Sequence, residues 1–201
     1  MTDLTQIDLA QITPPLRFTA GTKEIWQALA TIPRTGWIQW GILNPETVAK
    51  HILASRTLAL SWQNELELKT TELQDVLALI EVHDWPKIGA GDRVILGDEL
   101  EVEALRNMKK QAEREAMESL CISLPEREVI LELYNRFEVG VDRHAIIARE
   151  VGLFQTLFTA KRYEEQFKKP GLLKEFIIYT RDSITLPFLI KELSKIEKLQ
   201  K

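Results

Sequence analysis

Cysteine and long apolar runs are both scarce in this 201-residue chain. Its single cysteine, Cys121, cannot form an intrachain disulfide, which suits a reducing compartment. No apolar stretch approaches the roughly 20 residues that a membrane-spanning helix requires. The first residues carry acidic side chains and no basic region followed by an apolar run, which argues against a signal peptide. We therefore expect a cytoplasmic protein with no membrane partner.

The chain also has no excess of basic over acidic residues. The chain has 26 Lys and Arg against 30 Asp and Glu, which gives a net charge of −4. Proteins that bind DNA or RNA usually present a concentrated basic surface, so neither nucleic acid is an expected partner. The chain is 45% hydrophobic and 28% charged, a balance typical of a folded globular protein.

The sequence shows neither the alternation typical of β-strands nor an internal repeat, and its apolar residues follow helical spacing instead. We expect helices at residues 22–32, 44–64, 70–84, 98–123, 125–137, 142–167, 172–181 and 187–199. The segments 34–43 and 85–97 are expected to be loops. The pattern predicts an all-α protein, with a helical bundle and an N-terminal extension in residues 1–169. Residues 170–201 would be peripheral helices packed on or appended to the same domain.

Two of the three histidines continue the inward faces of neighbouring helices. His51 stands three residues after the apolar Val48, and His83 stands three after Ile80. Asp84 follows His83 directly. Imidazole and carboxylate groups on rigid helices are common ligands of divalent metals. For His83 taken alone a core histidine is the favoured interpretation, but beside His51 and Asp84 a metal site is favoured.

The sequence around these residues resembles the HD-domain metal-dependent phosphohydrolases, and within them the 5′-deoxynucleotidase-like branch. The likeness covers roughly residues 20–166 and rests on ordered motifs. These are RTGW (34–37), NPETVAKH (44–51), LALIEVHDWPKIGAGD (77–92), EREAMESL (113–120) and AKRYEE (160–165). The resemblance implies an HD-domain helical bundle and removal of the 5′-phosphate from a (deoxy)nucleoside monophosphate.

By position, the resemblance implies that His51, His83 and Asp84 are metal ligands, for Mn, Co, Mg or Zn. Asp92 matches an acidic residue that handles substrate near the metal, which makes it a candidate catalytic residue. Arg34 matches an arginine that contacts the substrate phosphate, and a guanidinium suits that task because it presents paired donors.

Trp37 follows Arg34 in the same motif and is a candidate for stacking on the nucleobase. The alternative is that the ring only fixes the loop to the bundle by being buried.

Two positions depart from the family pattern. Lys87 stands where a glutamate normally positions or activates the attacking water, which makes it the second candidate catalytic position. The last metal ligand, an aspartate, falls on Gly152, or on Val151 if the register shifts by one residue. Glu150 is the nearest carboxylate, but two residues along a helix correspond to a rotation of about 200°, so it should face elsewhere.

These departures leave two functions open. The first is a metal-dependent phosphomonoesterase acting on nucleoside monophosphates or other phosphate-bearing small molecules. The second is a non-catalytic module for nucleotide binding, phosphate binding or assembly, in which the Lys87 ammonium replaces the charge of the metal and no cofactor is needed. The family resemblance further implies a homodimer, for which the small residues of segment 100–116 offer an interface.

Overall fold

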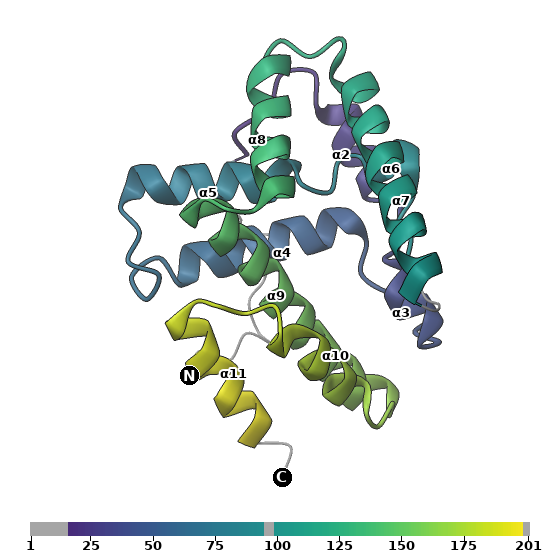
Figure 1. The fold of residues 1–201 in the computed structure, drawn as a ribbon, viewed down its shortest axis with the longest axis vertical. Coiled ribbons are helices and arrows are strands. Elements are labelled where there is room, and N and C mark those ends of the chain that lie inside the picture. Colours follow the sequence, from purple (N-terminus) through teal and green to yellow (C-terminus); the bar gives the residue numbers. More distant parts are fainter. Residues whose placement is uncertain (1–15, 95–98, 199–201) are drawn as a thin grey trace.

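Three helices at the centre of the molecule pack against one another and enclose the core: α4 (Val48–Ser61), α5 (Thr70–Val82) and α9 (Arg143–Phe167). In the computed structural model, α4 and α5 lie side by side and α9 crosses them (Figure 1). The structure describes residues 16–94 and 99–198. These central helices position the two histidines of the candidate metal site, because α4 carries His51 and α5 ends directly before His83.

Shorter and peripheral helices surround this centre. α10 packs on α9, α11 packs on α10, and α8 contacts both α5 and α9. No strand occurs in the described residues, where the only extended pairing is an isolated bridge between Pro33 and Thr47. The expected all-α class is therefore confirmed. The remaining helices are α2 (Lys23–Leu29), α3 (Thr35–Gln39), α6 (Lys87–Ala90), α7 (Glu99–Cys121), α8 (Arg127–Val139), α10 (Leu172–Arg181) and α11 (Pro187–Lys198).

Both segments expected to be loops contain a short helix. α3 lies within 34–43 and α6 lies within 85–97, and neither is long enough to show helical periodicity in the sequence. The helix expected from residue 44 begins at Val48 instead. Asn44 has a left-handed backbone (φ 52°), and Thr47 is the N-cap, accepting a hydrogen bond from the backbone N–H of Lys50.

The apolar face predicted for α5 is confirmed, because Leu73, Val76, Leu77 and Ile80 are all buried. The same helix also buries a charged residue, Glu81. Its carboxylate lies 2.7 Å from the guanidinium of Arg56 on α4, and both side chains are almost fully shielded from solvent. Burial raises the pKa of Glu81, and the Arg56 charge opposes that rise.

Glu81 also fastens the segment that precedes α2. Its two carboxylate oxygens accept hydrogen bonds from the backbone N–H groups of Arg17 (2.9 Å) and Phe18 (3.0 Å). Phe18 itself is buried against Trp85, with ring centroids 6.1 Å apart. One buried carboxylate thus joins α4, α5 and the chain before α2.

None of the helices in the described ranges is long and apolar enough to cross a membrane. α10 lies directly against α9, so the C-terminal helices pack on the bundle. The domain boundary at residue 169 stays a prediction.

Replacing Glu81 with glutamine keeps its shape and removes its charge. Breaking a buried ion pair from one side costs about 3–5 kcal/mol, so we expect E81Q to lower the free energy of unfolding by that amount in urea denaturation followed by circular dichroism. The control is Gln74→Ala on the exposed face of α5, which should change stability by less than about 0.5 kcal/mol. Equal effects of the two substitutions would contradict a structural role for this ion pair.

Candidate metal and phosphate site

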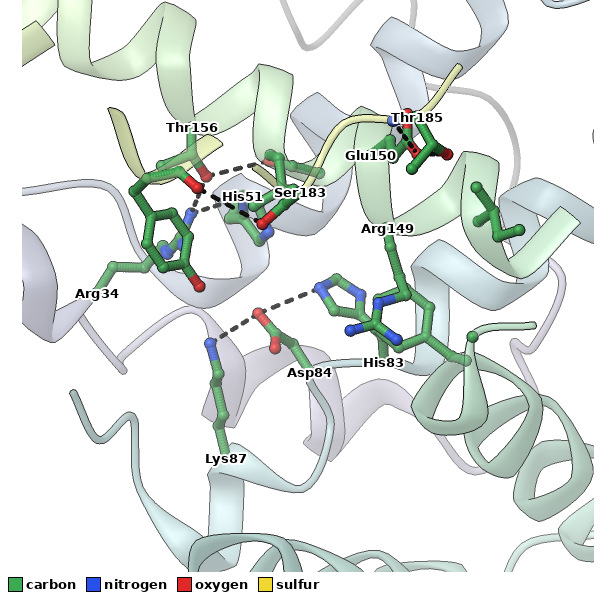
Figure 2. A pocket seen from close by; sticks show the side chains of 16 residues that line it. Arg34, His51, His83, Asp84, Lys87, Arg149, Glu150, Thr156, Ser183 and Thr185 are labelled. Atoms are coloured by element: carbon green, nitrogen blue, oxygen red, sulfur yellow. Dashed lines mark hydrogen bonds and ion pairs between the residues drawn. The ribbon is translucent and has the colours of Figure 1, made fainter. Parts of the chain in front are cut away.

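A pocket of about 520 Å³ opens between α9, the end of α5 and the start of α4. Figure 2 shows His51, His83, Asp84 and Lys87 at one end of it, with Arg34 beside them. His51 comes from the first turn of α4, whereas His83 and Asp84 follow the last turn of α5. The packing of α4 against α5 is what brings these residues together.

The three predicted metal ligands converge. One ligand atom each from His51, His83 and Asp84 can be chosen so that all lie within 4.8 Å of one another. The two imidazole rings have centroids 5.6 Å apart. No further His, Cys, Asp or Glu in the described parts of the chain joins this group. A cation between these atoms would have three protein ligands.

The hydrogen-bond partners of Nδ1 decide whether each imidazole presents Nε2 as an unprotonated ligand atom. The His83 Nδ1 lies 2.7 Å from the carbonyl oxygen of Ile80, which can only accept, so Nδ1 carries the proton. The His51 Nδ1 lies 2.5 Å from Oε1 of Gln155, also an acceptor. The partner of His83 fixes its tautomer, whereas at His51 the donor Nη1 of Arg34, 2.8 Å from the same Nδ1, competes with Gln155. Hydrogen bonding of Nδ1 to an acceptor is the usual second-shell arrangement of metal-bound histidine.

Burial favours the protonation states that metal binding requires. It lowers the pKa of His51 strongly, with the Arg34 charge adding to the effect, and it lowers the pKa of His83 despite the adjacent Asp84. Burial alone would raise the pKa of Asp84, but the charge that His83 carries when its ring is protonated and the Lys87 ammonium hold it far below its ordinary value. At neutral pH the group therefore consists of two neutral imidazoles and one carboxylate, and this donor set fits a divalent cation.

Lys87 competes for the same carboxylate. Its Nζ lies 2.9 Å from Oδ2 of Asp84 and 2.7 Å from Oδ1 of Asp92. Burial would lower the pKa of Lys87, but the two carboxylates outweigh it, so the amine stays protonated. Asp92 is held in turn by the backbone N–H of Thr35 at 2.6 Å. The ammonium is thus fixed beside a metal ligand, where it disfavours a cation.

Gly152 stands at one of the two positions where the family resemblance predicts a further metal ligand. A Cβ built on it would lie 4.0 Å from Nε2 of His51, with no closer neighbour. Val151, the alternative position, is fully buried in the core. Glu150 also lines the pocket, but its carboxylate accepts hydrogen bonds from the backbone N–H groups of Thr185 (2.8 Å) and Leu186 (3.0 Å) and does not join the three predicted ligands. The site therefore has space, but no side chain, at position 152.

Arg34 lies where it can meet an anion in the pocket. Its Nη1 donates to Oε1 of Glu46 (3.3 Å) and to Oγ1 of Thr156 (3.1 Å), and lies 2.8 Å from Nδ1 of His51. Its Nε and Nη2 groups make no hydrogen bond to the described residues. The guanidinium is thus held by one nitrogen, and its other N–H groups are available to a ligand.

Trp37 and Asp92, also predicted as site residues, do not line the pocket. Trp37 is 1% exposed, its Nε1 donates to Oε1 of Glu46 at 3.0 Å, and its ring packs on Phe176. This burial matches the alternative reading, in which the tryptophan fixes the loop to the bundle. Asp92 reaches the site only through Lys87.

Sequence reasoning missed Glu46 and Gln155, which hold Arg34 and His51 in place. Gln155 lies on α9 three residues after Gly152, so helical spacing already put it near the same face. Glu46 falls at the start of the helix predicted for residues 44–64, and no sequence signal marks its partners.

Comparison with known proteins places this geometry in context. Residues 26–190 match the sequence model of a protein family that is described as HD domain. The 5′-deoxynucleotidase HDDC2 of Bos taurus is 29% identical over 171 residues, covering 84% of this chain and 79% of the relative. The 5′-deoxynucleotidase hdd1 of Schizosaccharomyces pombe is 27% identical over 154 residues, covering 74% and 73% of the two chains.

Solved structures show the same fold. The crystal structure of the PH0347 protein from Pyrococcus horikoshii superposes with a TM-score of 0.69 at 21% identity, covering 88% of this chain and 96% of that one. A conserved hypothetical protein from Pyrococcus furiosus gives 0.68 at 20% identity, covering 87% and 96%. These likenesses agree with the expected helical bundle.

Placing aspartate at position 152 should complete the candidate metal site. We expect Gly152→Asp to bind Mn²⁺ at least about tenfold more tightly than the parent in isothermal titration calorimetry, which corresponds to about 1.4 kcal/mol. The neutral Gly152→Asn is the matched control and should bind close to the parent level. If the two variants bind Mn²⁺ equally, position 152 does not face a cation site.

Proposed function

This chain belongs to the HD-domain family, and from that membership we propose that it binds a nucleoside monophosphate and hydrolyses its 5′-phosphate in a metal-dependent reaction. The products would be a nucleoside and inorganic phosphate. The observation that carries the proposal is the convergence of two neutral imidazoles and a carboxylate within 4.8 Å, next to the available N–H groups of Arg34. The named relatives, 5′-deoxynucleotidases, support this substrate class.

His51, His83 and Asp84 would hold the cation. When bound, a divalent cation supplies Lewis acidity for the phosphoryl group and for the attacking water. Arg34 would bind the phosphate oxygens with its Nε and Nη2 groups, since a guanidinium can donate two parallel hydrogen bonds to them. A pocket of about 520 Å³ is within the range of roughly 300–1,000 Å³ usual for small-molecule sites.

The proton of the attacking water needs an acceptor, and Asp92 is the candidate that the family resemblance provides. The Lys87 ammonium lies 2.7 Å from its Oδ1 and helps to hold the pKa of Asp92 low, although burial opposes this. A carboxylate in this ion pair is a weak base. We therefore expect the reaction to be slow compared with that of a site carrying glutamate at position 87.

A second function is favoured by one specific observation, the bridge that Lys87 forms between Asp84 and Asp92. An ammonium in this position neutralises the carboxylates without a metal. The pocket would then bind a phosphate-bearing ligand through Arg34 and Lys87 and would not hydrolyse it. The two functions share the ligand and differ in whether a cation is required.

A metal-dependent phosphate-release assay separates these functions. We expect the parent to release phosphate from deoxynucleoside monophosphates with added Mn²⁺ or Co²⁺ and not in the presence of a chelator. His83→Gln should abolish the release. Binding of a nucleoside monophosphate without any release, at every metal concentration, would establish the second function in place of the first.

Two substitutions of Lys87 test how its charge affects metal binding and the rate of phosphate release. Lys87→Met removes the competing charge and should strengthen Mn²⁺ binding. Lys87→Glu should also raise the rate, because a positioned general base contributes about 10²–10⁴-fold. A rate that is unchanged in Lys87→Glu would show that this position does not face the reacting water.

A homodimer and a cytoplasmic location also remain proposals. The dimer is supported by the exposure of two apolar side chains on α7, Leu105 (43%) and Met108 (69%), which a second copy of the chain could cover. We expect sedimentation velocity to give twice the chain mass of 23.2 kDa, and Met108→Glu to return the monomer. A parent protein that sediments as a monomer would contradict the proposed dimer.

A further inference from the structure

A hydrogen-bond acceptor and a hydrogen-bond donor both lie close to the same nitrogen of His51. Gln155 Oε1, an acceptor, lies 2.5 Å from Nδ1, and Arg34 Nη1, a donor, lies 2.8 Å from it. Nδ1 can donate to the first or accept from the second, but it cannot do both. Figure 2 shows the close approach of Arg34 to His51. The choice decides whether Nε2, on the pocket side of the ring, carries a proton.

Glu46 contacts both competitors. Its Oε2 accepts from Nε2 of Gln155 at 3.0 Å, which turns the amide so that Oε1 must face His51. Its Oε1 accepts from Nη1 of Arg34 at 3.3 Å. The second hydrogen of Nη1 is directed to Oγ1 of Thr156, at 3.1 Å. Nη1 carries two hydrogens and lies within reach of three acceptors, so its contacts with Glu46 and Thr156 compete with donation to Nδ1 of His51.

The surroundings of Glu46 suit such a role. The residue is 5% exposed, and its carboxylate also accepts from Nε1 of Trp37 (3.0 Å) and Oγ1 of Thr159 (3.3 Å). A buried carboxylate with this many donors has a fixed orientation. It lies outside the pocket lining and touches neither the candidate cation position nor the candidate phosphate position.

We propose that Glu46 is a positioning residue that selects the tautomer of His51. By orienting Gln155 and engaging Arg34, it keeps the proton on Nδ1 and leaves Nε2 free as a ligand atom. The metal-binding consequence rests on the function proposed above, whereas the tautomer itself does not. Without the Glu46 carboxylate, Arg34 donates to Nδ1, and the proton moves to Nε2, where it points into the cation position.

The direct test is the ¹⁵N NMR spectrum of the His51 imidazole, which distinguishes the two tautomers without any metal. We expect the parent to carry the proton on Nδ1 and Glu46→Gln to shift the population towards Nε2. Gln155→Met should shift it in the same direction. Tyr163→Phe is the matched control, because the Tyr163 hydroxyl accepts from the backbone N–H of Glu46, at 2.7 Å, and this contact does not involve the Glu46 carboxylate. It should leave the tautomer unchanged.

Mn²⁺ binding is the second readout. Loss of a second-shell partner typically lowers metal affinity 10–100-fold, and we expect a decrease in that range for Glu46→Gln and Gln155→Met, with none for Tyr163→Phe. The exchange variant Glu46→Gln with Gln155→Glu again places an acceptor opposite Nδ1, so it should restore both the tautomer and most of the affinity.

An unchanged tautomer in Glu46→Gln, or an equal change in Tyr163→Phe, would overturn the proposal. If the parent binds no Mn²⁺ at all, the metal-dependent function fails, and the NMR comparison alone still decides the role of Glu46.

Discussion

A charged group that is removed from water needs a partner, and this requirement shapes the site more than any other. Asp84 lies beside two neutral imidazoles that cannot balance its charge. The Lys87 ammonium supplies that balance at 2.9 Å and is itself balanced by Asp92 at 2.7 Å. A divalent cation held by Asp84 would supply the same balance. Metal binding would therefore be a competition between a cation from solution and an ammonium that the fold already holds.

The sequence predicts that His51 and His83 face one interior because both continue apolar helix faces, whereas the role of Asp84 beside them rests on its adjacency to His83 and on the family resemblance. His51 and His83 continue apolar faces that have to meet in the core, and a short connection makes their helices neighbours. The same spacing explains why Gly152 and Gln155 share one face of α9. Local pattern therefore located the candidate site, although the structure is needed to measure its geometry.

The sequence could not predict contacts that join distant residues through polar atoms. Glu46 meets Gln155 across 109 positions and Tyr163 across 117, and no periodicity records such a pairing. Trp37 shows the same limit, since its motif fits substrate stacking as well as burial and only its partners decide. The short helices α3 and α6 were missed because they have too few residues for a period to be visible.

The substitutions at positions 87 and 152 act together on the charge of the pocket. Relative to the family pattern, glycine at 152 removes one negative charge, and lysine at 87 exchanges a negative for a positive one. Together, these two differences would add more positive charge to the protein groups of the pocket than a bound divalent cation would. In either proposed function Arg34 would attract a phosphate without a metal, whereas the Lys87 charge is already shared between Asp84 and Asp92. Hydrolysis is different, since it requires activation of the phosphoryl group and of water. Anion binding is accordingly the property that both proposed functions share, and the cation decides only whether the bound phosphate reacts.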